Sequence, residues 1–568
     1  MRDRLPLPWW VRGYRKEWTR GDVIAGLTVA VMLIPQGMAY AALAGMPPVT
    51  GLYAAIVAII AYALVGTSGS LAVGPVAITS LLTLSGLEVI AEPGSPTYPA
   101  LAALLALTVG AVLLIAGGLR LGFLVNFLSH PVISGFTSAA AIVIGLSQIK
   151  DILGIDIGRP DGAVGIVAGV VREVSATSWV TLAVGAGAIL VLAAGKWLVP
   201  RAPVALAVMV AATGLSLIFG LKERGVAVVG DIPGGFPGPS LPESDWETIR
   251  RLIPVALTVA LVAYAEGVSV AKAIARRTRQ KVDANRELVA NGAANVAAGL
   301  FGGFPVAGGF SRTAVNHQAG ARTPLAGLVT AVVLGVTVLW LTPLLHHLPK
   351  AVLAAVVIVA VAGLVDVRDA LETWRVRRAD LAALAVTFAA TLGIGVEPGL
   401  AIGLAFSLVQ YLARSSNPHM TELGRVEGTR EYRNVTRWPT VRDPRVVLVR
   451  LDAPLFFANA KVFEDRIAAL LAERPEVIAV IVDASGVGDL DVSGANLLSE
   501  LDADLAASGV TLHLATVRGP VRDVLARSGQ WDRFEGRVHP NLTAAIAACV
   551  PGSMLLEPRP GEHPLAVV

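Results

Sequence analysis

The sequence predicts an α-helical membrane protein that carries a separate α/β domain at its C-terminal end. Hydrophobic residues make up 54% of the 568 residues, charged residues only 15%, and the mean hydropathy is +0.67. Soluble domains carry roughly 25% charged residues. The charge is also unevenly placed, because residues 421–568 hold 36 charged residues and the preceding 420 residues hold 52. This difference in charge density indicates a soluble domain that follows a membrane domain.

We expect five consecutive regions in the chain. They are an interfacial N-terminus, a transmembrane domain, a linker, an α/β domain and a C-terminal tail, at residues 1–22, 23–420, 421–440, 441–552 and 553–568. The first 22 residues hold six basic and three acidic residues, and the loops 276–286 and 366–380 are also basic. The positive-inside rule places these three segments in the cytoplasm. The α/β domain is then cytoplasmic too, in a multi-pass protein of the inner or plasma membrane.

Fourteen hydrophobic segments are visible in the membrane domain. A bilayer core of about 30 Å needs about 20 helical residues per crossing. Twelve stretches are plausible crossings, near residues 23–45, 49–66, 100–119, 132–149, 178–198, 203–221, 252–275, 288–301, 323–345, 350–365, 379–395 and 397–413. Two more, about 70–86 and 304–320, are apolar but interrupted by Gly, Pro, Ser and Thr, which is typical of half-helices. An even number of segments places both ends of the chain on one side.

The two halves of the membrane domain repeat weakly. The tetrapeptide LTVA at residues 27–30 recurs at residues 257–260, an offset of 230. The same offset pairs Gln36 with Glu266 and superposes the two interrupted segments. Because seven segments separate the two copies, the second copy is inverted. Paired interrupted segments are the best pointer in a sequence to a binding site near the bilayer midplane.

Each interrupted segment contains a helix that begins inside the bilayer. The first N–H groups of such a helix lack partners, and its dipole places roughly half a positive charge there. We expect an anion to satisfy both, at Val76 and Ala77 in one segment and at Gly309, Phe310 and Ser311 in the other. The alternative is that the glycines only allow close helix packing. Interruptions at matching positions in both halves favour binding.

Arg312 and Glu266 are charged residues within apolar segments. A charge inside the bilayer costs at least about 2.5 kcal/mol, so each residue needs compensation. We expect Arg312 to supply positive potential to the anion, the alternative being an arginine that reaches the cytoplasmic surface. Burial favours the protonated form of a carboxylic acid, which makes Glu266 a candidate proton carrier. A structural acid paired with an arginine such as Arg312 is the other interpretation.

Gln36 follows Pro35 inside the first span, where the proline weakens the helix. Its neutral amide suits hydrogen bonding to a substrate, and Tyr40, one turn later, would form a wall of the cavity. A polar contact between helices is the alternative for Gln36.

Composition excludes several classes of protein. The single cysteine, Cys549, rules out an intramolecular disulfide and a paired-cysteine zinc or redox site, and no histidines are spaced as a metal site. A net charge of +4 without a basic face argues against nucleic-acid binding. No nucleotide-binding glycine loop or catalytic constellation is present, so we expect neither a cofactor nor an enzymatic activity.

Several stretches resemble a known family. They read PQGMAYAALAGMPPVTGLY and GTSGSLAVGPVAITSLL within residues 31–82, and PVISGFTSAAAIVIGLSQIK at residues 131–150. These are similar to signatures of the sulfate permease family of anion transporters. The acid in AYAEGVS (Glu266) and the arginine in GFSRT (Arg312) follow in the expected order, and the likeness extends over essentially the whole chain.

The resemblance implies a seven-plus-seven inverted repeat in which a core domain moves against a gate domain in an elevator-like cycle. It also implies a homodimer and an anion bound between the third and tenth segments. The residues expected to contact the anion are Gln36, Tyr40, Val76, Ala77, Gly309, Phe310, Ser311 and Arg312. Substrates across the family include sulfate, bicarbonate, dicarboxylates and halides.

From Arg445 the periodicity changes to that of an α/β layer fold. Strands near 445–451, 477–483 and 511–517 should alternate with helices near 460–473, 493–508, 519–528 and 541–549. This part resembles the STAS domain, shared with anti-sigma-factor antagonists, in which a serine at the position of Ser493 is phosphorylated. An N-cap at the start of the helix is the simpler explanation for Asp491 and Ser493 here. We expect the domain to act in dimerisation, folding or regulation.

The predicted function is secondary active transport of a small inorganic anion, with sulfate in symport with protons as the first expectation. A bicarbonate or C4-dicarboxylate transporter, and an anion exchanger or channel of the same family, are alternatives. A membrane-anchored signalling protein and a nucleobase transporter of the same architecture are others, and Arg312 disfavours the last. The expected partners are the anion, protons, the lipid bilayer and a second copy of the chain, but no nucleic acid.

Overall fold

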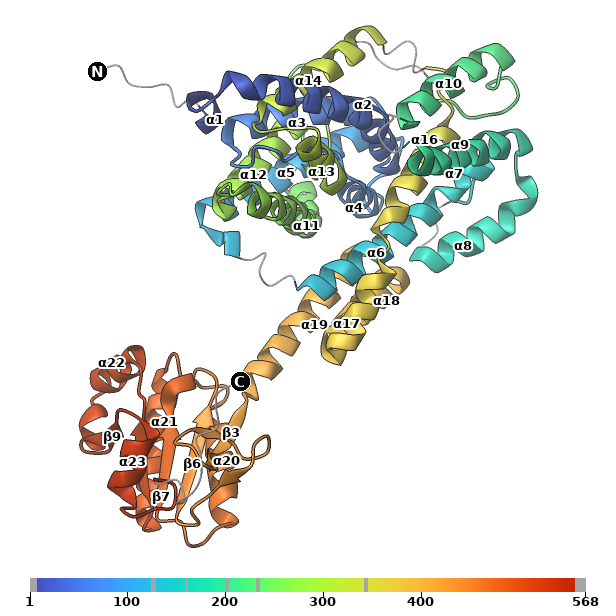
Figure 1. Ribbon diagram of the computed structural model, residues 1–568. Coiled ribbons are helices and arrows are strands. Elements are labelled where there is room, and N and C mark those ends of the chain that lie inside the picture. The colour runs from blue at the N-terminus through green and yellow to red at the C-terminus, as the bar shows by residue number, and fades with distance from the viewer. Residues whose placement is uncertain are drawn as a thin grey trace, which may run out of the picture. The chain divides into compact units, whose positions relative to one another are not determined.

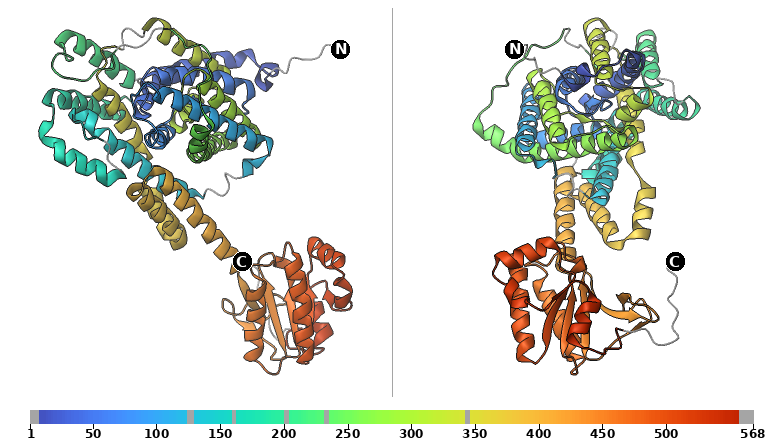
Figure 2. Two further views of the ribbon diagram at one scale, coloured as in Figure 1. Left: turned by 180° about the vertical axis from the view of Figure 1, so that it is seen from behind. Right: turned by 60° about the vertical axis from the view of Figure 1, so that its left-hand side comes forward.

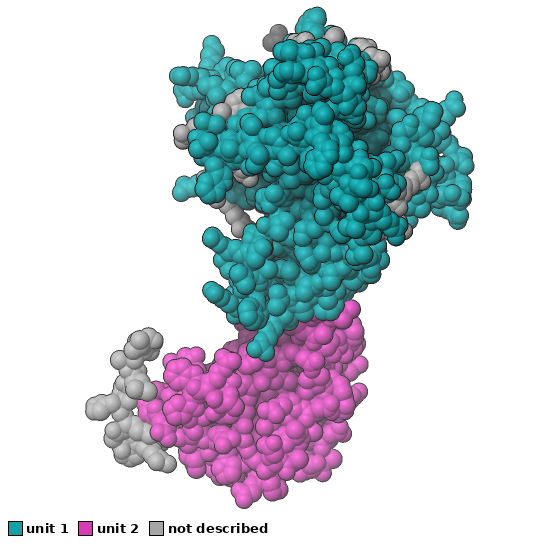
Figure 3. All heavy atoms as spheres, turned by 90° about the vertical axis from the view of Figure 1, so that its right-hand side faces the viewer, with its two compact units in different colours: residues 1–407 teal, residues 408–568 magenta. Residues whose placement is uncertain are grey.

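The chain folds into two compact units. The computed structural model describes residues 8–123, 129–158, 162–199, 204–230, 235–341 and 346–556. The units comprise Met1–Ser407 and Leu408–Val568 and are coloured separately in Figure 3. The first unit is almost entirely helical, and the second combines a sheet with helices (Figure 1). The fold class predicted from the sequence is confirmed.

The fourteen predicted membrane segments are present among the described residues. In the first half they are α2 (Thr19–Leu43), α3 (Thr50–Val65), β1 (Val73–Gly74) with α4 (Ala77–Leu87), α5 (Tyr98–Gly118), α6 (His130–Ser147), α9 (Trp179–Leu198) and α10 (Val204–Phe219). In the second half they are α11 (Trp246–Thr278), α12 (Ala284–Leu300), β2 (Ala307–Gly308) with α13 (Phe310–Gln318), α14 (Leu325–Val336), α16 (Lys350–Val361), α18 (Arg378–Gly393) and α19 (Val396–Ser416). Five helical stretches of the described chain are long and apolar enough to cross a membrane, and five shorter helices are also apolar.

Several connections that we expected to be loops contain short helices. The connection 150–178 includes the end of α7 (Ile149–Leu153) and all of α8 (Gly162–Glu173), and the basic loop 366–380 contains α17 (Val367–Val376). Near the N-terminus, α1 (Trp9–Arg12) lies against the end of α3, because Trp9 Nε1 donates to the carbonyl of Gly66 and Trp10 Nε1 to that of Ala63. The two indoles thereby anchor the segment that precedes α2.

The membrane helices form two groups. The helices α2, α3, α5, α11, α12 and α14 surround the short helices α4 and α13, whereas α6, α9, α10, α16 and α18 pack on one another (Figure 1 and Figure 2). The first four segments of each half thus make up the first group, as an inverted repeat requires. The groups correspond to the predicted core and gate domains. Within the core, α12 packs closely on α5 through glycines, as small residues allow in membranes.

Two short antiparallel strands join the interrupted segments at the centre of the core. Val73 pairs with Gly308 and Gly74 with Ala307, and the N–H of Gly309 donates to the carbonyl of Ala72 at 3.0 Å. Backbone outside helices must find such partners where water is absent. The strands are followed by α4 and α13, whose N-caps, Val76 and Gly309, are 233 residues apart. The offset of 230 therefore does not superpose the half-helices residue by residue.

The C-terminal unit is built on a sheet with the strand order β4-β3-β6-β7-β8-β9, and β5 also pairs with β3. The strands are β3 (Met420–Val426), β4 (Tyr432–Asn434), β5 (Thr440–Val441), β6 (Val446–Leu451), β7 (Ala479–Asp483), β8 (Thr511–Ala515) and β9 (Val538–His539). The helices are α20 (Ala460–Ala472), α21 (Val492–Ala507), α22 (Gly519–Arg527) and α23 (Leu542–Cys549). β6 to β9 are parallel, whereas β3 is antiparallel to β6.

Helices cover both faces of this sheet (Figure 2). One core is formed by alternate residues of β6, β7 and β8 with α20, α21 and α22, and the other by the intervening residues with α23. The strands and helices that the sequence predicted from Arg445 onward are all found.

The range 421–440, which we expected to be a linker, is instead part of the sheet. It contains nearly all of β3 together with β4 and the start of β5, and Glu422 pairs with Val449 of β6. The charged residues Glu422 and Arg425 are buried here. Hydrogen bonds compensate their burial, since Glu422 accepts from Arg474 and Arg425 donates to the carbonyl of Met554. These charges obscured the strand in the sequence. The first residues of the expected tail also pack, since Ser553 Oγ donates to Asp443.

The crossing of α2 and α3 generates a testable prediction. A Cβ atom at Gly51 would collide with the carbonyl oxygen of Gly37, so the helices can approach this closely only because residue 51 has no side chain. We expect Gly51→Ala to lower the unfolding midpoint of the purified protein by several degrees, measured by tryptophan fluorescence in detergent. Gly145→Ala is the matched control, because nothing lies within 4 Å of that Cβ position. Equal midpoints for the two variants would contradict the prediction.

A second prediction concerns two stacked histidines of β8 and β9. The rings of His513 and His539 have centroids 5.3 Å apart, with Nδ1 of His513 3.1 Å from Nε2 of His539. Burial, with further contributions from His539 and Arg537, lowers the pKa of His513 from 6.5 to about 4. Between these values the unfolded chain binds more protons than the folded one. The stability that the neutral His513 contributes to the folded domain is therefore fully present above about pH 6.5 and is lost as the pH falls toward 4.

This pH dependence can be measured by hydrogen exchange of peptides that cover β8 and β9 in the full-length protein. After correction for the intrinsic rates, we expect the opening free energy to fall by the order of 3 kcal/mol between pH 6.5 and 4. His513→Asn should flatten the profile. An identical pH profile in the variant would show that another group is responsible.

Candidate functional site

The half-helices α4 and α13 begin next to each other with open N-termini. Neither helix has a side chain that caps its first turn. Val76 and Ala77 are buried at the start of α4, whereas Phe310 is 65% exposed and Ser311 is also exposed at the start of α13. No N-cap side chain therefore satisfies the first N–H groups of either helix. That an anion binds there stays a prediction.

Arg312 lies in the first turn of α13 and is only 1% exposed. Its Nη1 donates to the carbonyl of Pro75 at 2.7 Å, which ties α13 to the chain just before α4. Nε and Nη2 have no hydrogen-bond partner among the described residues. The interpretation of Arg312 as a side chain that reaches the cytoplasmic surface is therefore wrong. Two donors of a buried cation remain available in the interior of the core.

Gly309 makes room for this guanidinium. A Cβ at Gly309 would lie 2.8 Å from Nη2 of Arg312, whereas one at Gly74 would be in ordinary contact with the same atom, at 3.5 Å. Gly74 is instead required by its backbone, because its φ of 155° is one that L side chains rarely adopt. Gly309 therefore does more than allow helix packing, since it shapes the space around the charge.

Glu266 and Tyr40 are brought to the same place from α11 and α2. The carboxylate of Glu266 interacts electrostatically with Arg312, and the phenol of Tyr40, which is uncharged at neutral pH, lies close to the same guanidinium. Within the described chain, Oε2 of Glu266 is buried without a hydrogen-bond partner, and the same holds for Oε1 of Gln36. Tyr40 is buried, and Gln36 lies one turn before it. The predicted residues therefore come from four elements of the core, and several of their polar atoms are unsatisfied.

Sequence reasoning missed the residues that hold this backbone in place. Asn295 of α12 accepts from the N–H of Val306 at 2.9 Å and donates to its carbonyl at 3.0 Å, which fixes the chain before β2. Thr313 accepts from the N–H of Ala72 at 3.0 Å. Both are polar residues in apolar segments, and that is the signal that could have identified them.

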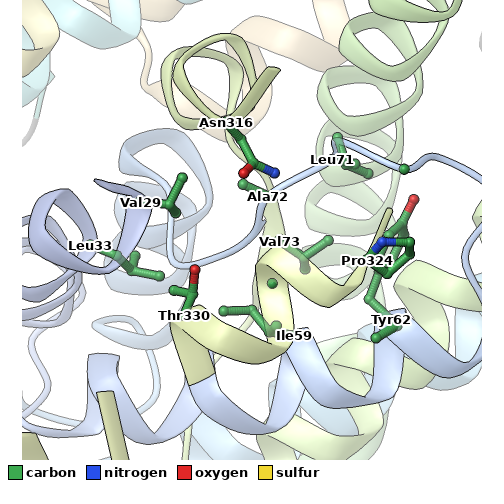
Figure 4. A pocket seen from close by; sticks show the side chains of 13 residues that line it. Val29, Leu33, Ile59, Tyr62, Leu71, Ala72, Val73, Asn316, Pro324 and Thr330 are labelled. Atoms are coloured by element: carbon green, nitrogen blue, oxygen red, sulfur yellow. The ribbon is translucent and has the colours of Figure 1, made fainter. Parts of the chain in front are cut away.

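A small cavity lies elsewhere in the core, between α2, α3, α13, α14 and the residues before β1. Figure 4 shows its lining, which includes Tyr62, Ala72, Asn316 and Thr330. The cavity volume is about 10 Å³. This is room for roughly one water molecule. None of the predicted binding residues lines it. The cavity is therefore not formed by the predicted binding residues.

Two further observations concern metals and Ser493. No group of three or more His, Cys, Asp or Glu side chains in the described ranges could hold a metal ion. Ser493 is exposed in the first turn of α21, whose N-cap is Asp491, and Asp491 accepts from the N–H of Gly494 at 2.7 Å. The cap is thus the aspartate, and modification of Ser493 stays a prediction.

Comparison with protein families places this site in a known context. The sulfate permease family matches residues 19–387, and the STAS domain matches residues 437–545. The chain belongs to the sulfate permease family. This family member is 39% identical over 540 residues to sulfate transporter 4.1, chloroplastic, of Arabidopsis thaliana. The aligned region covers 92% of this chain and 78% of that protein. Its family is one of transporters, and all eight predicted binding residues fall within the matched range.

Solved structures support the same fold. The murine Solute Carrier 26 family member A9 anion transporter in the inward-facing state superposes with a TM-score of 0.87 at 25% identity, covering 94% of this chain and 92% of that one. The transmembrane domain of the cyanobacterium bicarbonate transporter BicA gives a TM-score of 0.59 at 25% identity, covering 69% and 98%. This sulfate permease family member therefore has a helical membrane domain and a C-terminal STAS domain, and its fold is similar to that of a known anion transporter.

Proposed function

We propose that this protein transports sulfate in symport with protons across an inner or plasma membrane. The observation that carries the proposal is the buried guanidinium of Arg312. Two of its nitrogens, Nε and Nη2, have no hydrogen-bond partner among the residues that the structure describes, and they lie beside the N-termini of α4 and α13, which no N-cap side chain satisfies. A small oxyanion would accept from both the guanidinium and the helix N–H groups. Gln36, Tyr40, Val76, Ala77, Gly309, Phe310 and Ser311 complete the proposed site.

The arrangement of the site supports an elevator-type cycle. All the proposed binding residues belong to α2, β1–α4 and β2–α13, which are elements of the core group. A movement of the core against the gate would therefore carry the anion with its whole coordination shell. We further propose that the N-terminus and the STAS domain are cytoplasmic and that two chains associate as a homodimer.

Glu266 is the proposed coupling residue. It interacts electrostatically with Arg312, and its Oε2 has no hydrogen-bond partner in the described part of the chain. A proton on Glu266 would leave the positive charge of Arg312 available to the anion, whereas an ionised carboxylate would compete with the anion for it. Proton and anion binding would thereby favour each other.

The first experiment is uptake of radiolabelled sulfate into proteoliposomes, with and without an imposed pH gradient. We expect saturable uptake that the gradient stimulates, and unlabelled bicarbonate and fumarate serve as competitors. Saturable bicarbonate uptake without sulfate uptake would favour the second candidate, which the likeness to BicA supports. Currents far above carrier turnover would identify a channel instead.

Arg312→Gln tests the proposed site. The amide keeps a polar side chain but removes the charge, so we expect the KM for sulfate to rise by at least about tenfold, the scale of one lost charge-assisted contact. Arg250→Gln, at an exposed arginine that pairs with Glu247, is the control and should leave the KM unchanged. An unchanged KM in Arg312→Gln would remove this residue from the binding site.

Glu266→Gln tests proton coupling separately from anion binding. The variant should still exchange sulfate across the vesicle membrane when both sides contain sulfate, because the amide resembles the protonated acid in charge. It should not respond to an imposed pH gradient. Glu247→Gln, at the exposed start of α11, should behave as the native protein. Gradient-stimulated uptake by Glu266→Gln would place the coupling proton on another group.

A further inference from the structure

Two buried carboxylates outside the proposed site hold the loops that adjoin the half-helices. Asp22, near the start of α2, and Glu287, near the start of α12, are both 0% exposed. Neither is explained by anion binding or proton coupling as proposed above. Each is satisfied by hydrogen bonds from a loop that belongs to an interrupted segment.

Glu287 fixes the loop between α3 and β1. Its Oε1 accepts from the N–H of Thr67 at 2.8 Å and from the Thr67 hydroxyl, and its Oε2 accepts from the hydroxyl of Tyr62 at 2.9 Å. The same tyrosine oxygen accepts from the N–H of Ser68 at 3.3 Å. We call this set, Glu287 with Tyr62 and Thr67, the Glu287 clamp.

Asp22 fixes the loop between α13 and α14 in the corresponding way. Its Oδ1 accepts from the N–H groups of Arg322 at 2.7 Å and Thr323 at 3.1 Å. Its Oδ2 accepts from the hydroxyl of Thr323 at 2.7 Å. We call this set, Asp22 with Arg322 and Thr323, the Asp22 clamp. In both clamps the carboxylate therefore accepts from the N–H and from the hydroxyl of one threonine, and Asp22 accepts in addition from the N–H of Arg322.

The clamps cross between the two halves of the inverted repeat. Asp22 belongs to the first half and holds a loop of the second, whereas Glu287 belongs to the second half and holds a loop of the first. The two loops also touch each other. Ser70 Oγ donates to the carbonyl of Ala321 at 3.3 Å, and no Cβ could be placed at Gly69 because the carbonyl of Arg322 occupies that position.

Hydrogen bonds lead from these loops to the proposed anion site. Asn316 of α13 donates to the carbonyl of Ser70 at 2.9 Å, and Figure 4 shows its side chain extending toward the segment that carries Leu71 and Ala72. Ala72 then donates to Thr313 Oγ1 and accepts from the N–H of Gly309, each at 3.0 Å. Gly309 is the N-cap of α13. The segment before α4 and the segment that begins α13 are thus held to each other by one network of hydrogen bonds.

From this geometry we infer that Asp22 and Glu287 are positioning residues that set the two half-helix N-termini against each other, each from the opposite repeat. This inference rests on the proposed function, because positioning has a purpose only if the two N-termini bind one anion. Preorganised donors bind an anion more tightly than donors that must first be ordered. Removal of a hydrogen bond from either clamp should therefore weaken anion binding and leave the rate of movement of the core nearly unchanged.

The test removes one hydroxyl from each clamp and leaves the buried carboxylates in place, because removal of a buried acid risks loss of folding. Thr67→Val and Thr323→Val keep the shape of the side chain, and Thr67→Ser and Thr323→Ser keep the hydroxyl. Thr213→Val is the matched control, since within the described ranges the hydroxyl of this buried threonine of α10 bonds only to the carbonyl of Met209 in its own helix.

The first measurement is sulfate uptake by these variants in proteoliposomes. We expect each valine variant to raise the KM about five- to tenfold with the maximal rate within about twofold of the native protein, on the scale of a lost hydrogen bond to a charged group. The serine variants and Thr213→Val should retain the native KM. A native KM in both valine variants, or a reduced maximal rate alone, would overturn the inference.

The second measurement does not depend on the substrate. Hydrogen exchange of the ligand-free, full-length protein should accelerate in residues 68–76 and in residues 305–313 for each valine variant, although each variant alters only one loop. Acceleration confined to the altered loop, or no acceleration, would overturn the inference. If the native protein takes up no sulfate but exchange accelerates in both segments, the cross-repeat positioning stands and the sulfate assignment falls.

Discussion

A buried positive charge at the junction of two half-helices is the constraint on which the membrane unit depends. Arg312 is 1% exposed, and among the described residues only its Nη1 has a hydrogen-bond partner, the carbonyl of Pro75. A buried charge with unsatisfied donors is costly and persists where function uses it. Gly309, which leaves room for the guanidinium, and Glu266, which interacts electrostatically with it, follow from the same requirement.

The second constraint is that a helix interrupted inside a bilayer exposes backbone groups that water cannot satisfy. The structure meets it with the ladder of β1 and β2 and with polar side chains that bond to the backbone, such as Asn295 and Thr313. The first turns of α4 and α13 are left without a capping side chain at their N-caps, Val76 and Gly309. The proposed site therefore coincides with helix ends that no N-cap side chain satisfies in the described part of the chain.

Predictions from the sequence were most accurate where a long pattern carried the signal. Apolar stretches and the alternation after Arg445 located the membrane segments and the α/β elements to within a few residues. The strands β3 to β5 were missed because they are short or carry buried charges, such as Glu422 and Arg425, each of which has a partner distant in the sequence, Arg474 and Met554. Within the site, Arg312 was found as a charge in an apolar segment, whereas its burial required the fold.

The sequence by itself determined the fold class, the two interrupted segments and the identity of their charged residues, because hydrophobicity, glycine and proline act locally along the chain. Only the tertiary structure decided which polar atoms remain unsatisfied and which are paired. Asp22 and Glu287 illustrate the reason. Their partners, Thr323 and Thr67, are 301 and 220 residues distant in the sequence. Folding of both halves together brings each carboxylate beside a backbone N–H that is so distant in the sequence. No local sequence pattern encodes such a contact.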